Sequence, residues 1–279
     1  MTKTVSKLTW LPKKTFELEF SLPWEQVKKT YDQVLNSVVK SAKIEGFRPG
    51  KAPQNLVEKN IDQGKLYGEV INQLLPVSYA TSVTEHRLRP AVAPKITIIK
   101  AEPNAPWQFK ALSCELPEVK LENYEGAVRS SLVKSKLENK ELTETQKLNL
   151  IAKSLLDSVK IELSDLLIES ERDRLLAKLL DQVQKLGLTI DQYAASNQKT
   201  VDQLKTEYGL TASNSLKLEI ILQAIADAKK ITADHKEIDK LIAASGDDKL
   251  KKQLDTPAER AYLGSVLRKR QVIDFLLKI

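Results

Sequence analysis

Apolar and polar residues alternate strictly from Thr15 to Leu22, and this stretch constrains the fold more than any other part of the sequence. An extended chain turns successive side chains to opposite faces, so the pattern predicts a strand with one buried face. The buried face is expected to carry Phe16, Leu18, Phe20 and Leu22. A second candidate strand, residues 5–10, precedes it across a turn at residues 12–14, which predicts an opening β-hairpin.

Helical and extended patterns alternate through the rest of the front part. Apolar residues recur at helical spacing after Pro23 and again over residues 66–83. Two more strands are expected at residues 96–100 and 107–115, where apolar and β-branched residues flank a proline-containing break. Strands at both ends with helices between them predict an α+β domain over residues 1–116.

The composition changes beyond Pro117. No Phe, Trp or Tyr occurs over residues 125–192, where Leu and Lys dominate and every segment has helical periodicity. We therefore predict that residues 117–140 form a linker and that residues 141–279 form an all-helical domain. Five to seven helices are expected after about residue 127.

Local signals predict where several of these helices begin and end. Ser164 or Asp165 is expected to cap one helix, which Gly187 ends in the position that glycine favours. A later helix is expected to break near Gly209, and Thr232 is expected to cap another. Two helices have predicted buried stripes: Leu167, Ile168, Leu175, Leu179, Val183 and Leu186 in the first, and Leu263, Val266, Leu267, Ile273, Leu276 and Leu277 in the last.

Composition and motifs argue against a catalytic or metal-binding protein. Cys114 is the single cysteine, so no internal disulfide can form, and His86 and His235 have no partners at ligand spacing. The sequence contains no phosphate-binding loop and no nucleophile motif, so we expect neither an enzyme nor a cofactor. The start leads into no apolar leader segment and no long apolar run follows, which predicts a cytoplasmic protein without membrane association.

The net charge of +7 lies mostly in the front part of the chain. Residues 1–120 contain 18 Lys and Arg against 12 Asp and Glu, whereas residues 121–279 contain 26 against 25. Such a bias suits a polyanionic neighbour such as RNA. It is equally common in proteins that bind no nucleic acid.

An irregular segment between two predicted helices combines two glycines, two prolines, two cations and one large aromatic residue within eight positions. It reads Gly46, Phe47, Arg48, Pro49, Gly50, Lys51, Ala52 and Pro53. Glycine permits backbone angles that other residues resist and proline narrows the remaining freedom, so we expect a tight, stiff loop. Two interpretations of Phe47 stay open: the ring points outward beside Arg48 and Lys51 as a contact point, or it folds back onto its own domain.

The pattern Gly-Phe-Arg-x-Gly-Lys-x-Pro, placed between two helices of a small α+β domain, resembles the ribosome-docking signature of the trigger factor family of bacterial chaperones. Every fixed position is present, and Pro49 occupies the variable position, where many members carry Lys. The resemblance extends to the opening hairpin, to the exit from the last strand at residues 116–119, and to residues 216–226 in the helical part. It implies a ribosome-binding set: Gly46, Phe47, Arg48, Pro49, Gly50, Lys51 and Pro53.

The resemblance also implies a function and its partners. Family members hold nascent or unfolded polypeptides beside the exit tunnel of the large ribosomal subunit, where the loop contacts a ribosomal protein and rRNA. Their FKBP-like prolyl isomerase domain would fall between about residues 126 and 141, where a domain of about 100 residues has no room. We therefore expect no isomerase activity. The client-binding residues are not identified, and weak self-association into a dimer stays open.

Two alternatives from other functional classes remain. One is an RNA-binding module that uses the basic front part, although no basic strand face with interleaved aromatic residues is expected there. The other is a dedicated assembly chaperone that binds one specific client through the basic run Arg268, Lys269 and Arg270.

Overall fold

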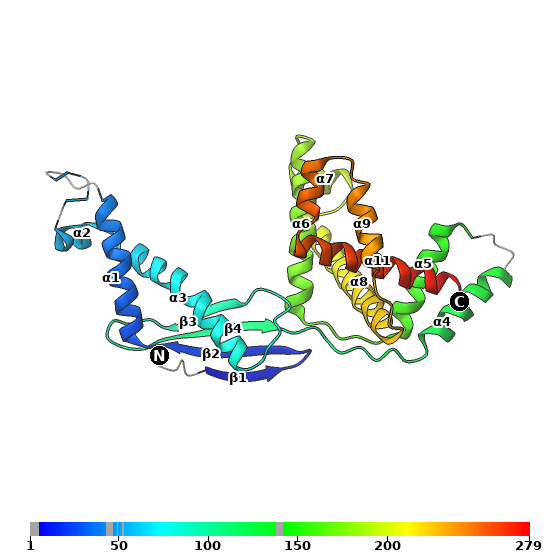
Figure 1. Cartoon of the computed structure of the whole chain (residues 1–279), viewed down its shortest axis with the longest axis horizontal. Helices are drawn as coiled ribbons and strands as arrows, with labels where there is room; N and C mark the ends of the chain where they lie inside the picture. Colours follow the sequence, from blue (N-terminus) through cyan, green and yellow to red (C-terminus); the bar gives the residue numbers. More distant parts are fainter. Residues whose placement is uncertain (1–5, 43–46, 49, 52, 138–141) are drawn as a thin grey trace. The chain divides into compact units, whose positions relative to one another are not determined.

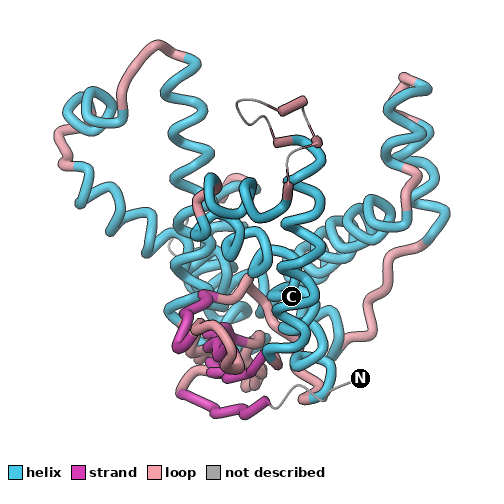
Figure 2. Tube along the Cα trace, turned by 90° about the vertical axis from the view of Figure 1, so that its left-hand side faces the viewer, coloured by secondary structure: helices cyan, strands magenta, loops and turns pink. Residues whose placement is uncertain are grey.

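The structure, a computed structural model, describes residues 6–42, 47–48, 50–51, 53–137 and 142–279 (Figure 1). Contacts within the chain divide it into two compact units, Met1–Leu116 and Pro117–Ile279. All strands of the described residues gather in one sheet of the first unit, and the described residues of the second unit form helices and connecting loops (Figure 2). The predicted fold class, α+β followed by all-α, is confirmed.

The first unit is built on a four-stranded antiparallel sheet with the strand order β1-β2-β4-β3. Its strands are β1 (Ser6–Leu11), β2 (Thr15–Leu22), β3 (Lys95–Lys100) and β4 (Trp107–Cys114). Leu18 lies opposite Ala111 and Phe20 opposite Phe109, so the apolar residues of the two central strands share one face. The alternation in the sequence and this register therefore agree.

The turn between β1 and β2 has an unusual backbone for its residue types. Lys13 and Lys14 both have positive φ, at 58° and 54°, and the Thr15 N–H donates to the Pro12 carbonyl at 3.2 Å. Two positive φ angles match the twist of a hairpin, which is why Asn-Gly is the preferred turn sequence. Lysine carries a Cβ that opposes this conformation at a cost of about 1–2 kcal/mol per residue.

Three helices complete the first unit: α1 (Trp24–Ser41), α2 (Gln54–Asn60) and α3 (Gln63–Glu85). Periodicity does not predict α2, because its seven residues span only two turns. After α3 the chain reverses through Arg87, whose φ is 54°, and the Leu88 N–H donates to the Val83 carbonyl at 3.0 Å. Arginine thus occupies the left-handed position after a helix that glycine usually takes.

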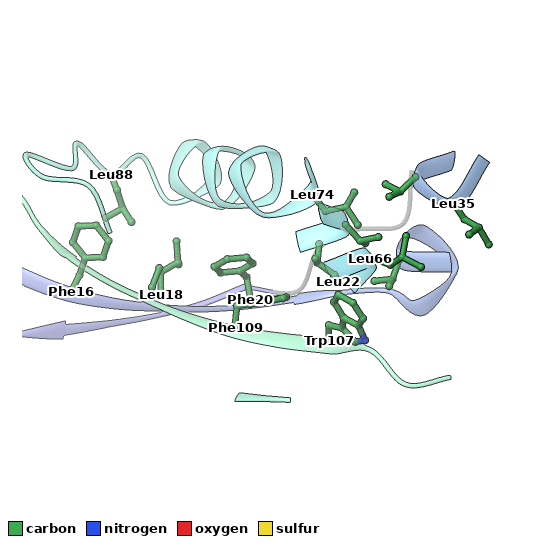
Figure 3. Packing of buried hydrophobic residues seen from close by; sticks show 14 residues of the cluster. Phe16, Leu18, Phe20, Leu22, Leu35, Leu66, Leu74, Leu88, Trp107 and Phe109 are labelled. Atoms are coloured by element: carbon green, nitrogen blue, oxygen red, sulfur yellow. The ribbon is translucent and has the colours of Figure 1, made fainter. Parts of the chain in front are cut away.

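The core of the first unit lies between α3 and one face of the sheet (Figure 3). The rings of Phe20 and Phe109 are stacked with their centroids 5.8 Å apart. The opposite face is charged, where the Lys110 Nζ lies 3.2 Å from a Glu17 carboxylate oxygen. The core includes Phe16, Leu18, Phe20, Leu22, Val27, Leu35, Leu66, Val70, Leu74, Leu88, Trp107 and Phe109.

The described residues of the second unit form eight helices, and seven of them begin after residue 127, at the upper limit of the five to seven predicted there. They are α4 (Tyr124–Leu137), α5 (Glu144–Ser158), α6 (Asp165–Lys185), α7 (Ile190–Ser196), α8 (Val201–Ala228), α9 (His235–Ala243), α10 (Asp248–Leu254) and α11 (Pro257–Leu277). The long helices α6 and α8 pack along each other, and α11 contacts α5, α8 and α9.

Several predicted helix boundaries are confirmed and two are wrong. Ser164 caps α6 by accepting a hydrogen bond from the Leu166 N–H, and Gly187, with φ of 73°, follows its C-terminus. However, α8 continues through Gly209, because one glycine weakens a helix without ending it. Asp234, and not Thr232, caps α9.

Part of the segment assigned to a linker, residues 117–140, is helical. Asn123 directly precedes α4, and its side-chain oxygen accepts a hydrogen bond from the Gly126 N–H in the first turn at 3.1 Å. On the buried side of the pair formed by α4 and α5, the Ser154 hydroxyl donates to the Ser131 hydroxyl at 2.8 Å. Thus α4 packs within the second unit.

The described residues contain neither a candidate membrane-spanning helix nor a candidate metal cluster. None of their helices is long and apolar enough to span a bilayer. They also contain no group of three or more His, Cys, Asp or Glu residues that could hold a metal ion.

Candidate functional site

The segment of residues 46–53, called here the docking loop, lies between the C-terminus of α1 and the N-terminus of α2. This is the end of α1 that lies away from the sheet (Figure 1). The structure describes five of its seven predicted site residues: Phe47, Arg48, Gly50, Lys51 and Pro53. The other two, Gly46 and Pro49, lie outside the described residues.

The described side chains of the loop are exposed to solvent. Phe47 is 42% exposed and is not a member of the core cluster of the first unit. Arg48 and Lys51 are exposed, and neither side chain forms an ion pair with another described residue. The described part of the loop therefore presents one aromatic ring and two cations to solvent.

Gly50 holds the loop against the end of α1. Its φ is 75°, and its N–H donates to the Ala42 carbonyl at 3.3 Å. A Cβ at this position would lie 2.6 Å from the Lys40 carbonyl oxygen, which is closer than side chains approach backbone atoms. The Lys51 N–H closes a turn on the Arg48 carbonyl at 3.0 Å. Glycine is thus required both for its φ and for its lack of a side chain.

A hydrogen bond attaches α2 to α1 and so fixes the far side of the loop. The Tyr31 hydroxyl donates to Glu58 Oε1 at 2.8 Å. Burial, followed by this bond and the Glu58 charge, raises the pKa of Tyr31 to about 12. The Tyr31 ring lies 5.3 Å from that of Tyr67, which lies 5.5 Å from that of Trp107 in β4. Sequence reasoning missed this pair, because residues 27 positions apart in different helices share no local pattern.

The second unit exposes large apolar side chains on several helices. Two of them, Leu186 and Val266, were predicted to be buried, and this prediction is wrong. Leu186 is the C-cap of α6, where the helical periodicity ends, and Val266 is turned about 100° from the buried Leu267. Others are Val133, Leu137, Leu180, Leu188, Leu210, Leu241 and Tyr262.

Two open grooves run between helices of the second unit. The groove between α6 and α8 has a volume of about 430 Å³ and is lined by Asp165, Ile168, Glu169, Arg172, Lys205, Thr206 and Gly209. The groove between α8 and α11 has a volume of about 300 Å³ and is lined by Glu219, Leu222, Gln223, Ala226, Ala261, Ser265, Arg268 and Lys269. Both grooves combine apolar and charged residues in their linings.

The basic run at Arg268 and Lys269 is engaged within the unit. Arg268 pairs with Asp227, and its Nε donates to the Ile231 carbonyl at 2.7 Å. Lys269 pairs with Glu219 of α8. These two cations therefore join α11 to α8 through ion pairs and line the groove between these helices.

Comparisons with known families cover nearly the whole chain. A family model described as bacterial trigger factor protein matches residues 1–151. A second, described as the C-terminus of bacterial trigger factor protein, matches residues 120–278. Each matches more than half of the chain.

Curated relatives and a solved structure are similar to this chain. The trigger factor of Lactobacillus gasseri is 36% identical over 39% of this chain and 24% of its own length, and that of Moorella thermoacetica is 37% identical over 42% and 26%. The chain thus spans about a quarter of the length of these relatives. A structure described as "Promiscuous Substrate Recognition in Folding and Assembly Activities of the Trigger Factor Chaperone" shares the fold, with a TM-score of 0.57 at 15% identity, over 98% of this chain and 99% of that one. With both family models matching, the chain belongs to the bacterial trigger factor family.

Proposed function

We propose that this protein is a chaperone that docks on the large ribosomal subunit through the loop around Phe47 and holds nascent or unfolded polypeptides without isomerising prolyl bonds. The observation that carries the proposal is the exposed Phe47 ring beside Arg48 and Lys51, on a loop held in place by Gly50. A ring kept in water by its own fold is available for burial in a partner.

The chemistry of the loop suits a mixed apolar and anionic partner. Burying the Phe47 ring contributes about 1.5–3 kcal/mol. Hydrogen bonds from Arg48 and Lys51 to carboxylates or phosphates contribute about 1.5–3 kcal/mol each. These anchors supply a large part of the ~8 kcal/mol of micromolar binding, before the cost of association is subtracted. The exit-tunnel protein and the rRNA phosphates beside it offer such a surface, and phosphate contacts make the binding salt-dependent.

The helical unit holds the client in this proposal. Its support is the set of exposed aliphatic side chains, such as Leu186 and Leu210, together with the grooves along α8. Contacts of this kind delay the burial of apolar segments until more of the client chain is available. The absence of isomerase activity is supported by the chain between Cys114 and Glu144, whose described residues contain α4 alone.

Ribosome pelleting at about 50 and 200 mM salt tests the docking proposal. We expect the variant with Phe47→Ala, Arg48→Ala and Lys51→Ala to bind at least about 100-fold more weakly, which corresponds to about 2.7 kcal/mol. The matched control removes one exposed aromatic ring and two exposed cations elsewhere, with Lys236→Ala, Lys240→Ala and Tyr262→Ala.

The control variant is expected to pellet like the unmodified protein. If the loop variant also pellets normally, the docking proposal is wrong. Protection of several unrelated unfolded proteins from aggregation tests the holding function, because a dedicated assembly chaperone would protect few of them.

A further inference from the structure

Three cations of the first unit occupy backbone positions that lysine and arginine disfavour. Lys13 and Lys14 form the β1–β2 turn and Arg87 follows α3, all with φ between 54° and 58°. Asn-Gly in the turn and glycine after the helix would remove the strain. Strained backbone positions cluster at functional sites, so they point to a place where a function can be sought.

Backbone contacts bring the three cations to the same end of the unit. The Glu115 N–H donates to the Lys14 carbonyl at 2.9 Å, and Glu115 Oε1 accepts a hydrogen bond from the Arg89 N–H at 2.7 Å. These bonds connect the β1–β2 turn, the end of β4 and the segment that follows Arg87. Lys13, Lys14, Arg87 and Arg89 are all exposed there.

An exposed aromatic ring lies at the same end. Trp10 pairs with Phe16 across the hairpin and is 49% exposed, and its ring meets the Phe16 ring edge-on with the centroids 5.7 Å apart. Leu88, between Arg87 and Arg89, packs in the same core cluster as Phe16 (Figure 3). We call the exposed surface at this end of the unit the hairpin-end surface. It consists of Trp10, Lys13, Lys14, Arg87 and Arg89.

We propose that the hairpin-end surface binds single-stranded nucleic acid. The four cations contact backbone phosphates, and Trp10 offers a face on which one base stacks. The surface lies at the hairpin end of the unit, whereas the docking loop lies beyond the far end of α1 (Figure 1). The proposal therefore does not depend on the function of that loop.

Chemistry favours nucleic acid over other anionic partners. An acidic peptide or an anionic membrane would use the cations, but carboxylate side chains and lipid phosphates do not by themselves pair each anionic group with a planar ring that stacks on an exposed indole. A single strand presents phosphates and unpaired bases together, whereas a duplex keeps its bases stacked inside.

The strained backbone permits a test in which RNA binding is lost without any loss of folding stability. Lys13→Asn with Lys14→Gly introduces the preferred hairpin turn and removes two cations. The variant is expected to unfold at the same temperature as the unmodified chain or higher. We expect its affinity for a short fluorescein-labelled single-stranded RNA, measured by anisotropy with the full chain, to fall about tenfold, and its salt slope to decrease by about 1.4.

Two further variants complete the experiment. Trp10→Leu is expected to weaken RNA binding about fivefold or more while leaving the salt slope unchanged. Lys249→Gln with Lys252→Gln removes the same charge from exposed positions of α10 and is expected to bind RNA normally.

Several results would overturn the proposal. One is unchanged RNA binding by the Lys13 and Lys14 variant. Another is binding of a duplex RNA, of poly-glutamate or of phosphatidylglycerol vesicles as tight as that of the single-stranded RNA. A third is loss of RNA binding in the Phe47, Arg48 and Lys51 variant alone. That last variant separates the two proposals, because it loses ribosome binding and retains RNA binding if both are correct.

Discussion

At the scale of single residues, Tyr31 and Glu58 decide how firmly α2, and with it one side of the docking loop, is attached to α1. A hydrogen bond from a neutral donor to a carboxylate contributes about 1.5–3 kcal/mol, and partial exposure at this site favours the lower value. The bond requires the protonated phenol. Its contribution therefore depends on pH in the alkaline range.

Tyr31→Phe is expected to lower the free energy of unfolding by about 1.5 kcal/mol at pH 7. The pKa of Tyr31 rises from 10.0 to about 12 on folding, so this stabilisation is fully present below pH 10 and is lost as the pH rises towards 12. The difference between the two proteins, measured by urea unfolding, should stay constant to about pH 9.5 and decrease by about pH 11.

Tyr262→Phe serves as the control, because this side chain is exposed on α11. It is expected to unfold like the unmodified protein at every pH. A difference for Tyr31→Phe that does not decrease above pH 10 would contradict the assigned role of the hydroxyl.

At the scale of secondary structure, the same substitution should have opposite effects at two glycines. Gly209 lies inside α8, and a Cβ there would meet only the Arg172 Cδ, at 3.9 Å. Gly187 has a φ of 73° after α6, and a Cβ there would contact nothing within 4 Å. Only the backbone conformation distinguishes the two sites.

Gly209→Ala is expected to raise the free energy of unfolding by about 0.5–1 kcal/mol, because alanine loses less entropy in a helix. Gly187→Ala is expected to lower it by about 1–2 kcal/mol, because a Cβ opposes the left-handed conformation. Chemical denaturation of the two variants measures both changes in the free energy of unfolding. A higher free energy of unfolding for Gly187→Ala would contradict the prediction.

Elements with long or strict patterns could be predicted from the sequence. The alternation in β2 and the cap at Ser164 express local rules, so their positions agree with the structure. Helix α2 is too short to repeat a pattern, and the exposure of Leu186 depends on where α6 stops. In the candidate site, the motif around Phe47 could be recognised from the sequence because its residues are contiguous. The contact of Tyr31 with Glu58 requires the folded arrangement of two helices.

At the scale of the whole molecule, the segment from Pro117 to the end of α4, where the family's isomerase domain would be inserted, should leave the protein without prolyl isomerase activity. Its aromatic residue Tyr124 is buried, and its hydroxyl donates to Glu125 at 3.1 Å. We expect a proline-containing peptide to exchange its cis and trans forms at the uncatalysed rate, over tens to hundreds of seconds at 25 °C. An FKBP-type isomerase is the positive control, and acceleration by this protein at catalytic amounts would show the expectation to be wrong.

The sheet of the first unit also sets an order of events during synthesis of the protein itself. Its central strands come from opposite ends of that unit, and the Glu17 and Lys110 that meet across them are 93 positions apart. Pairing over such a separation must overcome a large loop-closure entropy. Until residues 107–114 leave the ribosome, the first hairpin has an unpaired edge and uncovered Phe and Leu side chains. A newly made copy is exposed to aggregation during that interval. Under the proposed holding function, a finished copy would protect it.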